Sequence, residues 1–137
     1  MPFEQASPLA CAGTTIYTAI KRAGLKPGQT LGIVGLGALG LLGVQMSQAL
    51  GYKTVGIDSR PEPVELARSF STKSVQDYLI LQSNTPKDDA LNQIQSMDSN
   101  KAWKGLDAVI LATDAPESFE YGTALLRNHG TFVLVGQ

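Results

Sequence analysis

The feature that most constrains this sequence is a cluster of glycines between a short apolar segment and a longer one. Five of the 14 glycines lie between Gly32 and Gly43. Within this cluster the segment GLGALG, residues 35–40, matches the pattern G-x-G-x-x-G. The apolar residues 30–34 before it predict a strand, and residues 38–50 after it predict a helix. A strand, a glycine turn and a helix in this order predict a place where backbone comes close to a ligand.

Each glycine of the turn has a separate physical task in such a motif. Gly35 permits the sharp bend out of the strand, Gly37 lets a pyrophosphate approach the backbone, and Gly40 lets the helix pack close to the strand. The phosphates would then bind the free N–H groups at the start of the helix, where Ala38 and Leu39 are the first residues. This end of the helix dipole is positive. The motif therefore predicts a dinucleotide-binding turn.

An acidic residue downstream supports this interpretation. Asp58 ends the next predicted strand, 23 residues after Gly35, and a carboxylate at this spacing binds the hydroxyls of the adenosine ribose. Because it would repel a 2′-phosphate, Asp58 favours NAD over NADP. Arg60 argues the other way, since its guanidinium is able to meet a 2′-phosphate. A plain tight turn and a site for S-adenosylmethionine in a methyltransferase are the alternative interpretations.

The rest of the chain alternates strands with helices. Further strands are predicted over 53–57, 74–76, 107–112 and 131–135, and further helices over 8–23, 62–70, 90–97 and 116–128. The strands are apolar without alternation, which indicates a parallel sheet buried on both faces. We therefore expect one doubly wound α/β domain over residues 1–137, a Rossmann fold with helices on both faces of the sheet.

Composition excludes several classes of protein. The chain has 43% hydrophobic and 17% charged residues and a net charge of -1, too apolar and too nearly neutral for a disordered chain. This charge balance predicts no nucleic-acid or membrane partner. Cys11 is the single cysteine, so no internal disulfide is possible. With no signal-peptide pattern at the start, we expect a soluble, cytoplasmic protein.

Several segments together resemble the coenzyme-binding region of zinc-containing medium-chain alcohol dehydrogenases. These segments are PLACAGTTIY at 8–17, LKPGQ at 25–29, the glycine turn, GID at 56–58, DAV at 107–109 and GTFVLVG at 130–136. The resemblance implies NAD as the coenzyme, hydride transfer from an alcohol to nicotinamide, a small alcohol or aldehyde as substrate, and a homo-oligomer at full length.

The resemblance also implies roles for individual residues. Cys11 would be a ligand of the catalytic zinc and Thr15 would touch the nicotinamide. The positions expected on the two halves of the coenzyme are Tyr78 beside the adenine, Thr113 near the adenosine, and Val135 and Gly136 along the nicotinamide half. For Cys11 the alternative is a buried small hydrophobe, and for Tyr78 a core tyrosine.

The chain departs from the family pattern in three ways. Pro63 stands where a ribose-binding lysine is common, and Arg60 is its possible replacement. The other zinc ligands and the proton-relay residues belong to a catalytic domain that we do not find, so we predict that this chain alone is inactive. The sheet is expected to be truncated before its last strand. A zinc-free, NADPH-dependent quinone or enoyl reductase and a non-catalytic dinucleotide-binding module remain alternatives.

Overall fold

The core of the molecule is a single parallel sheet. The computed structural model describes residues 1–70 and 77–135. The strands are β1 (Thr30–Val34), β2 (Lys53–Asp58), β3 (Tyr78–Gln82), β4 (Leu106–Leu111) and β5 (Leu126–Leu134). Their order in the sheet is β3-β2-β1-β4-β5, and all four neighbouring pairs are parallel. The chain winds from β1 out to β3 and returns to β4 on the other side of β1, which confirms the doubly wound prediction.

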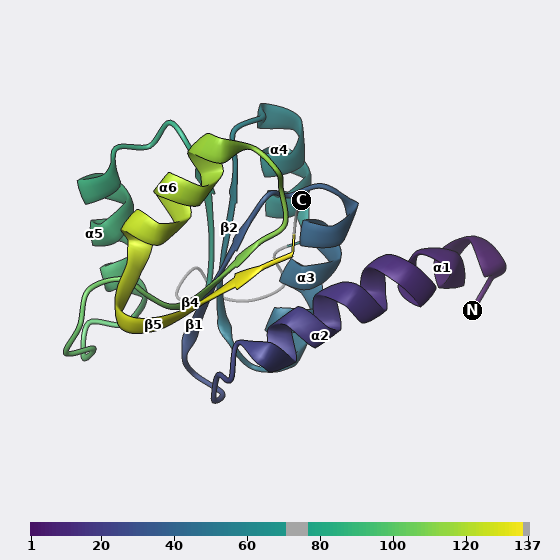
Figure 1. Cartoon of the computed structure of the whole chain (residues 1–137), viewed down its shortest axis with the longest axis horizontal. Helices are drawn as coiled ribbons and strands as arrows, with labels where there is room; N and C mark the ends of the chain where they lie inside the picture. Colours follow the sequence, from purple (N-terminus) through teal and green to yellow (C-terminus); the bar gives the residue numbers. More distant parts are fainter. Residues whose placement is uncertain (71–76, 136–137) are drawn as a thin grey trace.

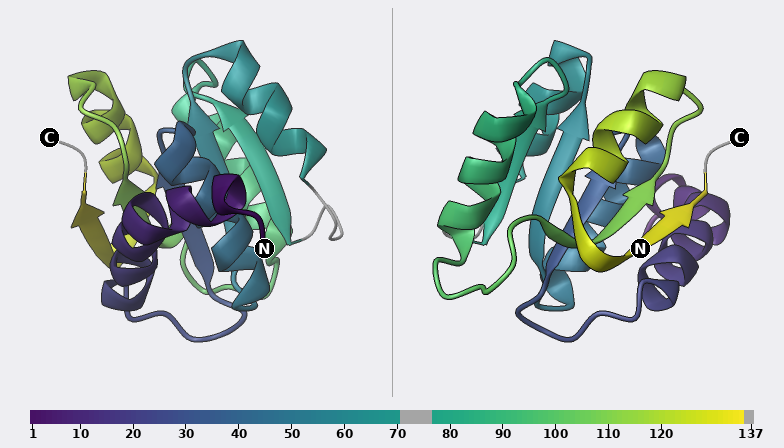
Figure 2. Two further views of the ribbon diagram at one scale, coloured as in Figure 1. Left: turned by 90° about the vertical axis from the view of Figure 1, so that its right-hand side faces the viewer. Right: turned by 60° about the vertical axis from the view of Figure 1, so that its left-hand side comes forward.

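Helices cover both faces of this sheet (Figures 1 and 2). They are α1 (Phe3–Pro8), the π-helical turn η1 (Leu9–Gly13), α2 (Thr14–Arg22), α3 (Ala38–Ala49), α4 (Pro61–Ser69), α5 (Lys87–Met97) and α6 (Pro116–Leu125). One core cluster packs α2, α3 and α4 against the sheet, around Ile16, Val44 and Val64. A second cluster packs α5 and α6 against the opposite face, around Ile94 and Leu125. Every residue of β1 and β4 is buried, as a two-sided sheet requires.

The first helical segment is longer than its apolar pattern predicts. Helix begins at Phe3 instead of residue 8 and continues through η1 to Arg22. None of the residues of α1 is buried, so this segment has no apolar stripe from which periodicity would detect it. In Figure 1 helix α1 extends away from the body of the molecule.

The weak strand expected over 74–76 lies outside the described residues, and a strand, β3, follows that segment. One predicted helix end needs correction. The helix expected over 116–128 ends at Leu125, and β5 begins directly at Leu126. The register with β4 shifts there: Leu106 pairs with Leu126, but Ala108 pairs with Thr131. Within this irregularity His129 has a φ of 59°. The residue type alone does not predict such a left-handed backbone conformation.

The bounds of the remaining elements agree with the predicted bounds to within a few residues. Helix α5, for example, begins three residues before the predicted start at 90. Within the described ranges, no helix combines the length and apolar character required to cross a membrane.

Candidate functional site

The glycine turn lies where the strand order of the sheet reverses. It follows β1, between the carboxyl ends of β2 and β4. The N–H of Gly35 donates to the carbonyl of Ile57 at 2.8 Å, and the N–H of Ala112 donates to the carbonyl of Val34 at 2.8 Å. In open α/β sheets this switch point is where ligands bind.

The three glycines of the motif meet different steric demands. Gly35 has a φ of +95°, and a Cβ there would lie 2.9 Å from the carbonyl oxygen of Ala112. A Cβ at Gly40 would collide with the carbonyl oxygen of Gly35, whereas a Cβ at Gly37 would find no heavy atom within 4 Å. Folding therefore requires glycine at 35 and 40, while the bare backbone at 37 faces open space. That difference fits a ligand which approaches Gly37 closely.

Helix α3 presents its N-terminus to the same open space. Gly37 is its N-cap, in extended conformation, and no side chain caps the helix. The first N–H groups of a helix have no partner within the helix, and here the exposed Gly37 and Ala38 leave them accessible. Twelve residues of aligned peptides follow, so the positive end of the helix dipole is available to an anion.

Asp58, the last residue of β2, is held against the turn by backbone and side-chain donors. Its Oδ2 accepts from the N–H of Leu36 at 2.7 Å and from Nη2 of Arg60 at 3.2 Å. Its Oδ1 accepts from the N–H and Nε of Arg60 at 2.9 and 3.2 Å. Burial raises the pKa of this carboxyl, but the hydrogen bonds from Arg60 and Leu36 outweigh burial and leave the pKa below its usual value. Asp58 is therefore ionised at neutral pH.

A cavity of about 470 Å³ opens beside this carboxylate. Its walls bring together Gly35, Asp58, Arg60 and Thr113, four of the residues that the sequence singled out. An adjoining hollow of about 680 Å³ has a partly acidic wall that includes Glu117. The sequence analysis missed the small residues shared by the two hollows, Ser59, Ser83, Ala115 and Ser118. Ser59 and Ala115 could have been found from the sequence, because they closely follow the predicted strands 53–57 and 107–112. Ser83 follows β3, which the sequence did not predict, and Ser118 lies in α6.

A different hollow, of about 550 Å³, lies between α2 and β5. Thr15 and Val135, both expected on the nicotinamide half, line it together with Thr18 and Phe132. The structure thus places Thr15 and Val135 on the walls of one hollow, and neither of them lines the cavity beside Asp58. Gly136 lies outside the described residues.

Tyr78 does not reach the site, which corrects the expectation that it lies beside the adenine. It is the first residue of β3 and pairs with Thr54, at the end of the sheet opposite the glycine turn. Its ring is 5% exposed, its hydroxyl donates to the carbonyl of Ala67 at 2.6 Å, and burial raises its pKa to about 12. The alternative, a core tyrosine, is the one that the structure supports.

Cys11 is exposed on the π-helical turn η1, so the alternative of a buried small hydrophobe is wrong. No group of three or more His, Cys, Asp or Glu side chains is gathered for a metal ion within residues 1–70 and 77–135. A protein zinc site takes at least three protein ligands. The described residues by themselves therefore do not form a zinc site.

The comparisons with known proteins agree with this architecture. The family model described as "Zinc-binding dehydrogenase" matches residues 38–137. "Alcohol dehydrogenase 1" of Emericella nidulans is 33% identical over 137 residues, 99% of this chain and 37% of that protein. "NAD-dependent alcohol dehydrogenase" of Saccharolobus solfataricus is 35% identical over 134 residues, 96% of this chain and 36% of that protein.

A solved structure shows the same fold. Acetophenone reductase from Geotrichum candidum, in complex with NAD, superposes with a TM-score of 0.71 and 24% identity over 96% of this chain and 33% of that chain. This chain spans a little over a third of the length of the curated relatives above, 37% and 36%. Since the family model extends over most of the sequence, from the start of α3 onward, the chain belongs to the zinc-binding dehydrogenase family.

Proposed function

We propose that this chain is the NAD-binding domain of a zinc-dependent alcohol dehydrogenase. The observation that carries the proposal is the ionised carboxylate of Asp58, held 2.7 Å from the N–H of Leu36 within the glycine turn. Backbone N–H donors for a pyrophosphate and a carboxylate acceptor for a ribose thereby lie next to each other. The names of the relatives, one of them NAD-dependent, and the NAD complex of a protein with this fold support the choice of coenzyme.

In this proposal each part of the site has one binding task. The N-terminus of α3, with Gly37, Ala38 and Leu39, receives the pyrophosphate. Asp58 accepts hydrogen bonds from the adenosine ribose, and Thr113 borders the cavity in which the adenosine would lie. The coenzyme would continue toward the hollow of Thr15 and Val135.

The charges around the cavity favour NAD over NADP. Asp58, Asp114 and Glu117 put acidic side chains on the walls of the two hollows. A 2′-phosphate would bring further negative charge next to these carboxylates, and like charges at short range repel. The one guanidinium in the cavity wall, that of Arg60, is already paired with Asp58.

For the whole protein we propose alcohol oxidation with a small alcohol or aldehyde as substrate. A zinc ion held by the whole protein would supply Lewis-acid chemistry, and Cys11 would contribute one of its ligands. We further propose a cytoplasmic homo-oligomer without nucleic-acid or membrane partners. Its support is the net charge of -1 and the exposed Leu134 on β5, which is an edge strand of the described sheet.

A coenzyme titration tests the binding part of the proposal. We expect saturable binding of NADH, followed by the enhancement of reduced-nicotinamide fluorescence, and binding of NADPH at least about tenfold weaker because of the repulsion described above. No saturable binding of NADH up to millimolar concentration would contradict the proposal. A clear preference for NADPH would instead favour the zinc-free reductase.

A further inference from the structure

All of the acceptor sites of the Asp58 carboxylate are occupied in the free protein. A carboxylate offers about four lone-pair directions. Here four donors point at them: the N–H of Leu36, the N–H of Arg60, and Nε and Nη2 of Arg60. A ribose diol needs two acceptors for its hydroxyl protons. It therefore cannot bind Asp58 unless two of these donors leave.

The four donors differ in how easily they can leave. The N–H of Leu36 belongs to a buried residue of the glycine turn, and that of Arg60 is fixed at the N-cap of α4. The two guanidinium donors sit on a long side chain that is 61% exposed, against 5% for the carboxylate that they contact. Water screens the exposed guanidinium and offers it other hydrogen-bond partners, which weakens its hold on the carboxylate. The guanidinium is thus the group that a ribose would displace.

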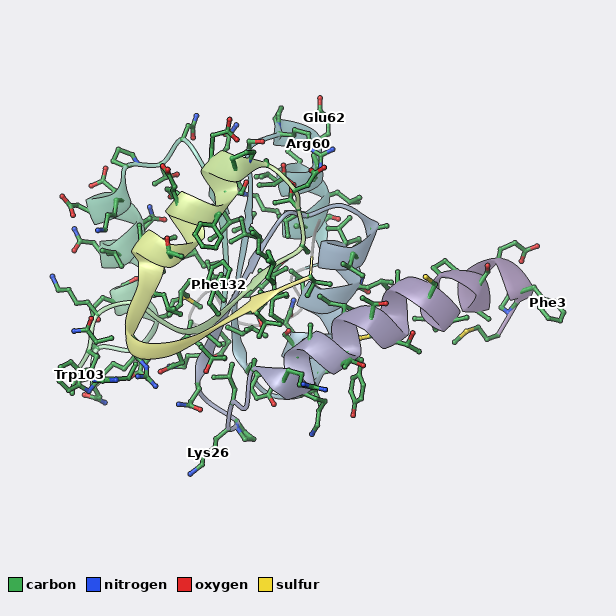
Figure 3. All side chains as sticks on the ribbon, viewed as in Figure 1. Phe3, Lys26, Arg60, Glu62, Trp103 and Phe132 are labelled. Atoms are coloured by element: carbon green, nitrogen blue, oxygen red, sulfur yellow. The ribbon has the colours of Figure 1, made fainter. Side chains whose placement is uncertain are left out.

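A second carboxylate follows Arg60 closely along the chain. Glu62 lies in the first turn of α4, two residues beyond Arg60, and Figure 3 labels both side chains at the same end of the molecule. The hydrogen bond to Asp58 is the main cause of the raised pKa of Arg60, and the charge of Glu62 adds to it. Glu62 is exposed and makes no competing contact with the cavity.

We propose that Arg60 is a displaceable cover of the ribose acceptor: its guanidinium occupies Asp58 in the free protein and moves to Glu62 when a vicinal diol binds. The proposal rests on the proposed function, since it assumes that Asp58 receives the adenosine ribose. In this arrangement Arg60 competes with the coenzyme, and Glu62 lowers the strength of that competition. Arg60 is the one cationic side chain among the described residues that line the cavity beside Asp58.

Variants of the two residues test the cover in opposite directions. Arg60→Ala removes both guanidinium donors but keeps the backbone N–H, so we expect NADH and ADP-ribose to bind more tightly, by up to about fivefold. Glu62→Gln removes the second position of the guanidinium, so we expect binding up to about threefold weaker. The matched controls are Arg68→Ala and Glu65→Gln, two exposed residues of α4 outside both hollows, and both are expected to leave binding unchanged.

The double variant separates a cover from simple electrostatics. In the Arg60→Ala background, Glu62→Gln should have no effect, because the side chain that it receives is absent. An analogue of ADP-ribose without the 2′-hydroxyl on its adenosine ribose should lose most of the gain from Arg60→Ala. Unchanged or weaker NADH binding by Arg60→Ala, or an equal effect of Glu62→Gln in both backgrounds, overturns the cover while leaving the proposed function intact. If neither the natural chain nor any variant binds NADH, the proposed function itself fails and the cover fails with it.

Discussion

Two buried aspartates show how single residues hold this fold and its candidate site in place. Asp58 and Asp107 are 6% and 4% exposed, and each is surrounded by donors. Asp107 accepts from the N–H of Thr30 at 2.8 Å and pairs with Lys101 and Arg127. Asp58 lies at the carboxyl end of β2, and Asp107 lies in β4 beside the first residue of β1. One carboxylate therefore supports the ligand site and the other the opposite end of the sheet.

Asp58→Asn should weaken coenzyme binding. The amide keeps the shape of the side chain but loses the charge, and hydrogen bonds to charged groups contribute roughly 1.5–3 kcal/mol. We expect NADH to bind at least about tenfold more weakly in isothermal titration calorimetry. The loss of affinity should be smaller for NADPH, because the repulsion of its 2′-phosphate also disappears. Glu65→Gln, an exposed carboxylate of α4, is the control. Equal NADH affinity in Asp58→Asn and the natural chain would contradict a ribose contact.

Asp107→Asn should chiefly lower stability. It leaves Lys101 and Arg127, both mostly buried, without their common counter-charge, and breaking a buried ion pair from one side costs about 3–5 kcal/mol. Urea unfolding at pH 7 measures this loss. An unfolding free energy within about 1 kcal/mol of the natural chain would contradict the role that we assign to Asp107.

The two buried aspartates predict that the chain loses stability in acid. Burial raises the pKa values of Asp58 and Asp107, but hydrogen bonds from their cationic and backbone donors lower both overall. Their stabilisation is therefore fully present above the unfolded-state pKa of about 3.9 and is lost as pH falls through the lower folded-state values. Unfolding free energy measured from pH 6 downward should fall below about pH 4, less steeply in Asp107→Asn. Equal slopes in both proteins would exclude Asp107 as a source.

At the scale of elements, the strand-turn-helix unit of β1 and α3 has two kinds of glycine. Gly35 and Gly40 lie against backbone, and Gly37 faces open space. The G-x-G-x-x-G pattern predicts a bend at Gly35 and close packing at Gly40, and the steric conflicts at these two positions agree with that prediction. The tertiary structure adds which atoms cause them: the carbonyl oxygen of Ala112 at Gly35, and that of Gly35 at Gly40.

Alanine substitutions in the turn should distinguish the glycines that folding requires from the glycine that faces open space. Gly37→Ala meets no steric conflict and lies at a φ of -70°, so we expect unchanged or slightly higher thermal stability. Its methyl group would nevertheless occupy the approach of the pyrophosphate, and NADH binding should weaken by about tenfold or more. Gly40→Ala, by contrast, should lose at least about 2 kcal/mol of unfolding free energy in urea denaturation, because its Cβ meets the carbonyl oxygen of Gly35. Unimpaired NADH binding by Gly37→Ala would argue against a close phosphate.

At the scale of the whole molecule, the chain presents a candidate coenzyme site, and its described part gathers no metal site. The exposed Cys11 lies in η1, directly after α1, and α1 extends from one side of the fold (Figures 1 and 2). We predict that the purified chain binds NADH but neither oxidises ethanol with NAD nor retains stoichiometric zinc after dialysis. Measurable turnover, or one zinc per chain by metal analysis, would refute this prediction.

The sequence alone predicted the doubly wound fold and the ligand turn, because their signals are local. Glycine spacing, buried strands such as residues 30–34 and the acid at 58 depend on neighbouring residues and on periodicity. It could not place β5 or Tyr78. The start of β5 depends on a register shift against β4, and the direction of the Tyr78 ring depends on α4, whose Ala67 carbonyl accepts its hydroxyl proton. Only the tertiary structure showed that Arg60 fills the acceptor sites of Asp58, since side-chain pairing is decided by the packed geometry of the turn and not by the order of residues.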